Sequence, residues 1–256
     1  MLAGADLGQW QGSPGGWQAD AGDISWAAVR LSEVHVDGSH HVDPDAPADW
    51  EFLKQASLGR IACLQAHPGS GADDAANMFM AVAGRAGLEA GDGIAVRLET
   101  TDGRNPAQVS LWLRLVTRQL QTKLNRDPLI YTDLAIAQAG ACAGLGNLPL
   151  WVNDPESPAG RPRVPAPWQS WTIHQVEVGP VCYGVADFAD LGVFRKALGR
   201  KGAAGSVQDH AQRWIGEHLG RLGGDGPAVT GEIAQLMRRI ATQAYTEGFR
   251  RGKGET

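Results

Sequence analysis

The sequence lacks the features that mark several large protein classes. Its three cysteines, Cys63, Cys142 and Cys182, are odd in number and far apart, so they predict neither a disulfide framework nor a cysteine metal site. No apolar run is long enough to cross a membrane. The 23 basic residues do not outnumber the 28 acidic ones, and the net charge is -5. This balance argues against a protein built mainly to bind nucleic acid or an anionic membrane.

Nucleotide-binding and export signals are also missing. Gly91-Asp92-Gly93 precedes a predicted strand rather than a helix, so it does not form a dinucleotide fingerprint, and there is no phosphate loop. Residues 1–12 have neither the basic start nor the apolar segment of a secretory signal. We therefore expect no organic cofactor. We also expect a chain that is cytoplasmic as synthesised, or is delivered outward by something other than its own signal.

One histidine-rich loop raises the question of a metal. His35, His40 and His41 lie near Asp37 and Asp43 in the sequence, and such residues are metal ligands in other proteins. A solvated polar loop is the interpretation that we prefer, and we expect no metal site.

Short apolar runs alternate with helical patterns along the first 200 residues. Strands are predicted at 1–7, 24–31, 61–64, 94–99, 129–131, 148–152 and 171–176, with a last one inside 185–194. Helices are predicted at 48–57, 72–86 and 135–143, and a longer one begins at Pro106 and ends before Asp127-Pro128. This alternation predicts an α/β fold of parallel units, and a compact (β/α) barrel fits the spacing best.

The composition changes after Leu198. Residues 199–205 (GRKGAAG) read as a linker between a barrel at 1–198 and an extension at 206–256. Apolar residues in the extension recur at helical spacing, which predicts amphipathic helices that bury one face on the barrel or on a protein partner.

The strand predicted at 94–99 carries two charged residues. Side chains alternate along a strand, so Ala95, Arg97 and Glu99 share one face while Val96 and Leu98 share the other. Buried charges are costly unless they are paired or used. A structural ion pair and an active-site carboxylate at the top of a parallel barrel are both compatible with this pattern.

In chain order, these segments resemble glycoside hydrolase family 25, the muramidases. The resemblance covers roughly residues 3–198 and rests on the order of several short motifs rather than on any one of them. The motifs are Gly4–Gly12, Ala28–Glu33, Ala66–Gly69, Leu129–Thr132, Leu150–Val152, Trp171–Gln175 and Ala189–Phe194. The resemblance implies a TIM-like barrel and retaining cleavage of peptidoglycan between N-acetylmuramic acid and N-acetylglucosamine.

The resemblance also implies site residues. The catalytic carboxylates would be Asp6, Glu99 and Asp190, with Asp187 as a weaker alternative to Asp190. Glu99 would be the general acid of the family's Asp-x-Glu pair. The substrate-binding residues would be Trp10, Trp151, Trp171, Gln175 and Arg97.

Several positions depart from the family's pattern. Arg97 replaces the Asp of Asp-x-Glu, Leu64-Gln65 replaces Tyr-His, His174 replaces a sugar-lining Trp, and Arg30 replaces Lys. A general acid needs a raised pKa, whereas a nearby positive charge lowers the pKa of a carboxyl group. We therefore expect Arg97 to weaken or abolish hydrolysis.

Three functional hypotheses follow. The first is a cell-wall glycan hydrolase with altered site residues. The second is a non-catalytic barrel, a pseudoenzyme that binds wall glycan or serves as a structural module. The third is a phage virion component that docks into an assembly through residues 206–256.

Overall fold

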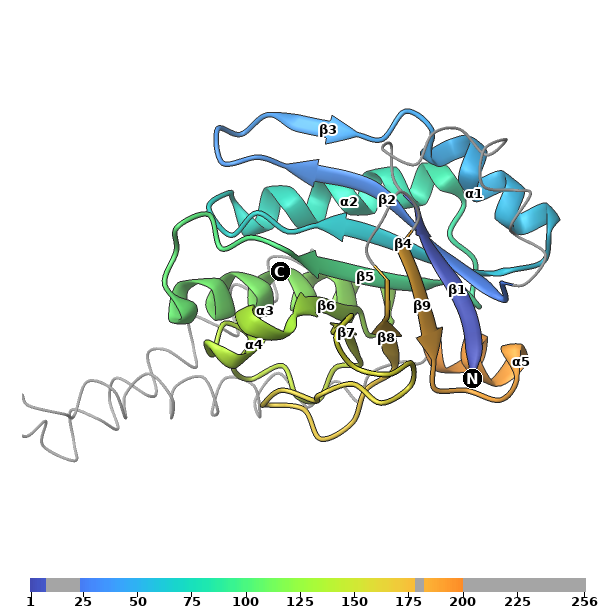
Figure 1. Ribbon diagram of the computed structural model, residues 1–256. Helices are drawn as coiled ribbons and strands as arrows, with labels where there is room; N and C mark the ends of the chain where they lie inside the picture. The colour runs from blue at the N-terminus through green and yellow to red at the C-terminus, as the bar shows by residue number, and fades with distance from the viewer. Residues whose placement is uncertain (8–23, 178–181, 200–256) are drawn as a thin grey trace, which may run out of the picture. The chain divides into compact units, whose positions relative to one another are not determined.

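A computed structural model of the protein describes residues 1–7, 24–177 and 182–199 (Figure 1). The predicted extension at 206–256 and all of the predicted linker except Gly199 lie outside the described residues. Within the described helices, none is long and apolar enough to span a membrane.

Eight of the described strands form a closed barrel (Figure 1). They are β1 (Leu2–Leu7), β2 (Trp26–Val34), β4 (Gly59–Gln65), β5 (Gly93–Leu98), β6 (Leu129–Asp133), β7 (Leu150–Asn153), β8 (Ile173–Gln175) and β9 (Cys182–Ala186). Pairing of β1 with β2 closes the ring, and neighbouring strands are parallel except that β9 runs antiparallel to β1 and β8. The predicted α/β barrel is therefore confirmed.

Five described helices accompany the strands. They are α1 (Ala46–Gln55), α2 (Ala72–Ala86), α3 (Pro106–Leu124), α4 (Leu134–Gln138) and α5 (Leu191–Leu198). α1 and α2 pack on β2 and β4, and α2 also packs on α3 (Figure 1). Asn105 and Gln108 form a reciprocal capping box at the start of α3, which satisfies two backbone N–H groups that the helix leaves unpaired.

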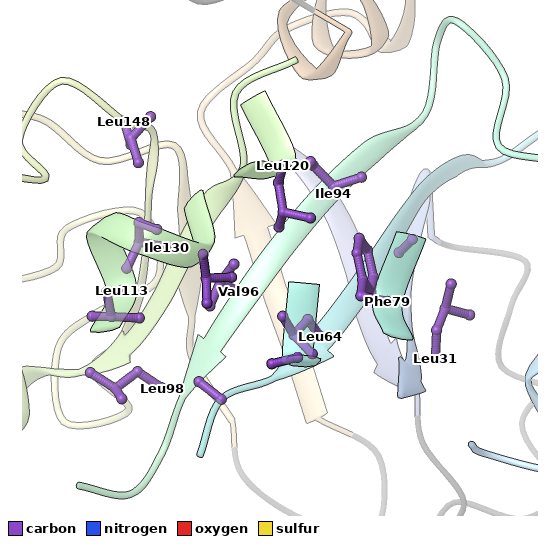
Figure 2. Packing of buried hydrophobic residues seen from close by; sticks show 14 of the residues in the cluster. Leu31, Leu64, Phe79, Ile94, Val96, Leu98, Leu113, Leu120, Ile130 and Leu148 are labelled. Atoms are coloured by element: carbon purple, nitrogen blue, oxygen red, sulfur yellow. The ribbon is translucent and has the colours of Figure 1, made fainter. Parts of the chain in front are cut away.

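The barrel wall separates two apolar layers. Outward-facing side chains of β5, namely Ile94, Val96 and Leu98, lie with Leu113 and Leu120 of α3 in the layer between strands and helices (Figure 2). Inward-facing residues form a second cluster, which contains Trp26, Ile61, Ala95, Tyr131, Trp151 and Phe194. The alternation predicted for the strand at 94–99 is thus observed, and it directs Arg97 into the barrel.

Three predicted elements differ from the structure. The last strand lies at Cys182–Ala186, before most of the predicted segment, and α4 is shorter than the helix predicted at 135–143. Residues His40–Val42, expected to be loop, form β3, which pairs antiparallel with β2. This three-residue strand has no apolar alternation, so its pairing with β2 creates it rather than its own sequence.

Candidate active site

The candidate site lies inside the barrel at the carboxyl ends of the parallel strands. It is a pocket of about 210 Å³, in the position where active sites of such barrels form. The lining residues come from β1, β2 and β5 to β9, with Glu99 directly after β5. They are Asp6, Leu7, Arg30, Arg97, Glu99, Tyr131, Asp133, Asn153, Gln175 and Cys182.

Arg97 stands between two carboxyl groups that line this pocket. Its Nη1 donates to Oδ2 of Asp6, and its Nη2 donates to Oε1 of Glu99 at 2.6 Å. The side chains of Arg97 and Asp6 are almost fully buried, whereas that of Glu99 is one third exposed. One guanidinium therefore pairs with both carboxyl groups expected to act in catalysis.

Two aromatic rings lie against the guanidinium group of Arg97. Its central carbon lies 4.4 Å from the centre of the Tyr131 ring and 5.8 Å from that of Trp151. The rings of Tyr131 and Trp151 meet edge to face, with centres 5.2 Å apart. Cation–π attraction is stronger where water is excluded, so the two rings fix Arg97 in its paired position.

The charges in the pocket shift the pKa of each group. Burial raises the pKa of Glu99, but the charge and hydrogen bond of Arg97 outweigh burial and hold this pKa below its ordinary value. For Asp6 the balance is reversed, because burial raises the pKa more than Arg97 lowers it. Burial lowers the pKa of Arg97, yet the charges of Asp6 and Glu99 hold it well above its usual range. Glu99 is thus kept ionised and Arg97 protonated.

A second contact fixes the other oxygen of Glu99. Nε2 of Gln65 donates to Oε2 of Glu99 at 2.9 Å. Gln65 occupies the position where the resemblance expected a histidine, so this departure also favours the ionised carboxylate.

Several polar atoms of the pocket residues lack hydrogen-bond partners among the described residues. They are Oδ1 of Asp6, Nε of Arg30, Nε of Arg97, Oδ1 of Asn153 and Oε1 of Gln175. Buried polar atoms are normally paired with protein, water or ligand. The pocket can therefore bind a ligand that offers both hydroxyl donors and carbonyl acceptors.

The structure brings together only part of the predicted site. Asp6, Arg97, Glu99 and Gln175 line the pocket. Trp151 is fully buried beneath Arg97 among the inward-facing residues. Trp10 lies outside the described residues.

Two predicted residues are not among the residues that line this pocket. Trp171 packs against the outer apolar layer rather than lining the pocket. Asp190 is exposed, and its Oδ1 accepts from the backbone N–H of Val193 as the N-cap of α5. The next residue, Leu191, packs near Gly59 at the start of β4, the opposite end of that strand from Gln65. Asp190 therefore stabilises a helix terminus, and Asp187 is likewise not among the pocket residues.

Besides Leu7 and Cys182, sequence reasoning missed four pocket residues. Arg30, Tyr131, Asp133 and Asn153 lie on β2, β6 and β7 and face the same cavity as Arg97. Nδ2 of Asn153 donates to Oδ1 of Asp133 at 2.6 Å. Their position in the sequence could have identified them, because polar residues near the carboxyl ends of parallel barrel strands meet at one mouth of the barrel.

Comparison with known proteins places this geometry in context. Residues 5–181 match the family model described as "Glycosyl hydrolases family 25". No curated protein matches the chain.

Several solved structures share the fold. A muramidase from Trichobolus zukalii is 20% identical, with a TM-score of 0.64 over 78% of this chain and 99% of that one. A bacterial lysozyme from Streptomyces coelicolor is 20% identical, with a TM-score of 0.63 over 77% and 97%. A family GH25 lysozyme from Aspergillus fumigatus is 17% identical, with a TM-score of 0.65 over 77% and 98%.

The family match spans more than half of the chain and includes the strands that carry Asp6, Arg97 and Gln175. The closed barrel and the carboxyl groups at its mouth agree with this match. The chain belongs to family 25 of the glycosyl hydrolases.

Proposed function

We propose that the barrel binds the glycan of peptidoglycan at its mouth and does not cleave it by the usual carboxyl chemistry. The observation that carries the proposal is the position of Arg97, whose guanidinium pairs with both Asp6 and Glu99. The substrate class rests on family membership and on the muramidases and lysozymes that share the fold.

Hydrolysis of a glycoside needs a protonated carboxyl group to donate to the leaving oxygen. Glu99 is the expected donor, but Arg97 and Gln65 both bond its ionised form and lower its pKa. A second carboxylate, or the acetamido group of the substrate itself, must stabilise the positive charge that develops on the sugar. Asp6 is the other carboxyl group that Arg97 bonds, and the positive charge of Arg97 offsets its negative charge. Glu99 therefore lacks the protonated state of a general acid, and Asp6 offers little free negative charge to a sugar cation.

Binding makes different demands from catalysis, and the pocket meets them. It is partly open, and it is lined by amide, carboxylate and guanidinium groups. The unpaired atoms of Arg30, Asn153 and Gln175 suit the hydroxyl and acetamido groups of an amino sugar. Its volume of about 210 Å³ suits one sugar unit rather than a long strand.

Co-sedimentation with purified, insoluble peptidoglycan tests this proposal. We expect the full chain to sediment with the polymer, and expect Gln175→Ala and Asn153→Ala each to weaken binding because each removes a pocket amide. Gln55→Ala, which changes an exposed residue of α1, is the matched control and is expected to bind normally. No sedimentation of the wild-type chain, or equal binding by all four proteins, would contradict binding at this pocket.

A reducing-end assay on the same peptidoglycan, read together with co-sedimentation, separates the remaining hypotheses. Release of reducing ends by the wild-type chain would favour an active hydrolase. Neither binding nor release would favour a purely structural role, such as a virion component docked through residues 206–256. That role rests on the sequence pattern of the extension alone.

A further inference from the structure

We propose that Glu33, His35 and His67 form a binding site for a zinc-like divalent metal at the rim of the barrel. Glu33 lies near the carboxyl end of β2, and His35 follows directly after that strand. His67 follows β4, the parallel neighbour of β2. The carboxyl ends of neighbouring parallel strands meet at one edge, which brings His67 to Glu33 although the two are 34 residues apart in the chain.

The spacing of the donor atoms fits a metal of this kind. Nε2 of His67 lies 3.4 Å from Oε2 of Glu33, and Nε2 of His35 lies 3.6 Å from Oε1 of Glu33. One donor atom from each residue can be chosen so that all three lie within 4.8 Å of one another. Two ligands of a tetrahedral zinc ion, with bonds of about 2.0–2.1 Å, are about 3.3 Å apart. Small rotations of the half-exposed His35 ring would close the remaining gap.

A second layer of contacts orients His67. Its Nδ1 lies 3.3 Å from Oδ1 of Asp102, and a proton on Nδ1 that is donated to this carboxylate would leave Nε2 free to bind a metal. Asp102 is itself held, because its Oδ2 accepts from the backbone N–H of Gly69 at 3.0 Å and its Oδ1 accepts from Oγ1 of Thr100 at 3.3 Å. A carboxylate behind a histidine is the arrangement that tunes zinc ligands in many proteins.

Exposure and donor type narrow the choice of metal. The side chains of Glu33 and His67 are mostly buried, and that of His35 is 40% exposed, so an ion can enter from solvent and keep a water ligand. Two imidazoles and one carboxylate suit zinc and its neighbours in the transition series, whereas magnesium and calcium prefer oxygen ligands alone.

The site differs from the one considered in the sequence. The histidine-rich loop placed His35 with His40, His41, Asp37 and Asp43, but the structure joins His35 to Glu33 and to a distant histidine. His40 instead bonds Oδ2 of Asp74 through Nε2 at 2.9 Å. Because this is a histidine–carboxylate pair outside the Glu33, His35 and His67 group, His40 provides a matched control.

Calorimetric titration of the metal-stripped full chain with zinc chloride tests the proposal. We expect one ion per chain, and a loss of at least tenfold in affinity in each of His35→Gln, His67→Gln and Glu33→Gln. Asp102→Asn should weaken binding by about 10- to 100-fold because it disturbs the orientation of His67. His40→Gln should bind like the wild type. Circular dichroism of each variant, compared with that of the wild type, verifies that the barrel is folded.

Cobalt provides a second measurement that does not depend on affinity. The wild-type chain with one equivalent of Co²⁺ should show the visible absorption of a low-coordinate ion, and the folded His67→Gln variant should lose it. The proposal would be overturned if zinc does not bind up to the millimolar range. It would also be overturned if the three ligand variants bind as tightly as the wild type, or if His40→Gln loses binding equally.

Discussion

At the scale of single residues, Arg97 accounts for most of the chemistry of the pocket. Its guanidinium bonds Asp6 and Glu99 and lies on the rings of Tyr131 and Trp151. A buried charge is tolerated only when it is paired, and Arg97 has two partners of opposite sign. The same pairing that makes this charge tolerable prevents Glu99 from holding a proton near neutral pH.

The pKa of Glu99 should respond directly to residue 97. In Arg97→Gln the charge that lowers this pKa most is lost while burial remains, so the pKa of Glu99 is expected to rise relative to that of the wild type. Carbon-13 NMR of the side-chain carboxyl group, followed through an acid titration, measures this pKa.

Arg163→Gln serves as the control for that titration. It also removes a guanidinium that bonds two carboxylates, Asp154 and Glu156, neither of which lines the pocket. The pKa of Glu99 should stay at its wild-type value in this variant. An unchanged Glu99 pKa in a folded Arg97→Gln protein would show that Arg97 does not control the carboxyl group.

Single residues also show where sequence reasoning stops. Asp6 and Glu99, which the family motifs indicated, line one pocket, and their catalytic role stays a prediction. Asp190 belongs to an equally similar motif, yet it caps α5. The sequence alone does not show whether an Asp before a helix caps the helix N-terminus or faces a substrate. The position of Asp190 in the folded barrel, away from the pocket, distinguishes the two roles.

At the scale of helices and strands, elements with strong hydrophobic periodicity were predictable from the sequence. Short strands that depend on pairing with a neighbour were not. The helix predicted at 72–86 has the observed bounds of α2, and the long helix begins at Pro106 as expected. Period-two alternation on β5 correctly predicted which face carries Arg97. β3 and β9 were missed or misplaced because each is held by its antiparallel neighbours rather than by a pattern of its own.

The capping box of α3 gives a prediction about stability. Asn105→Ala removes the side-chain acceptor of the Gln108 N–H and is expected to lower the free energy of unfolding by about 0.5–2 kcal/mol. Chemical denaturation followed by circular dichroism measures the change.

The control variant for α3 is Thr122→Ala, at an exposed position in its last turns. Its free energy of unfolding should lie within about 0.5 kcal/mol of the wild type, as for most surface changes. Equal losses in Asn105→Ala and Thr122→Ala would mean that the capping box contributes nothing specific.

At the scale of the whole molecule, closure of the barrel creates the site. Asp6 and Gln175 belong to strands at opposite ends of the sequence, and pairing of β1 with β2 and β9 brings them to one mouth. Sequence periodicity predicted the strands but not this closure, which followed from the family resemblance. The polar residues Arg30, Asp133 and Asn153 became visible as site residues only once the strands were closed.

Membership in a hydrolase family fixes the fold more firmly than the activity, because function depends on the groups at the site. This barrel keeps Asp6 and Glu99 in the pocket, and it carries Arg97 where the family's Asp-x-Glu pair has its Asp. These groups are the basis of the proposal that the barrel binds glycan without cleaving it.

Release of reducing ends from purified peptidoglycan, measured between pH 4 and 8 for the wild type and Arg97→Asp, tests this account most directly. Arg97→Asp restores the Asp-x-Glu pair and replaces the charge that lowers the pKa of Glu99 with one that raises it. General acid catalysis contributes about 10²–10⁴-fold, so a gain of that order over the wild-type background is expected. The account predicts no release by the wild type at any of these pH values. Release by the wild type that is abolished by Glu99→Gln would contradict it.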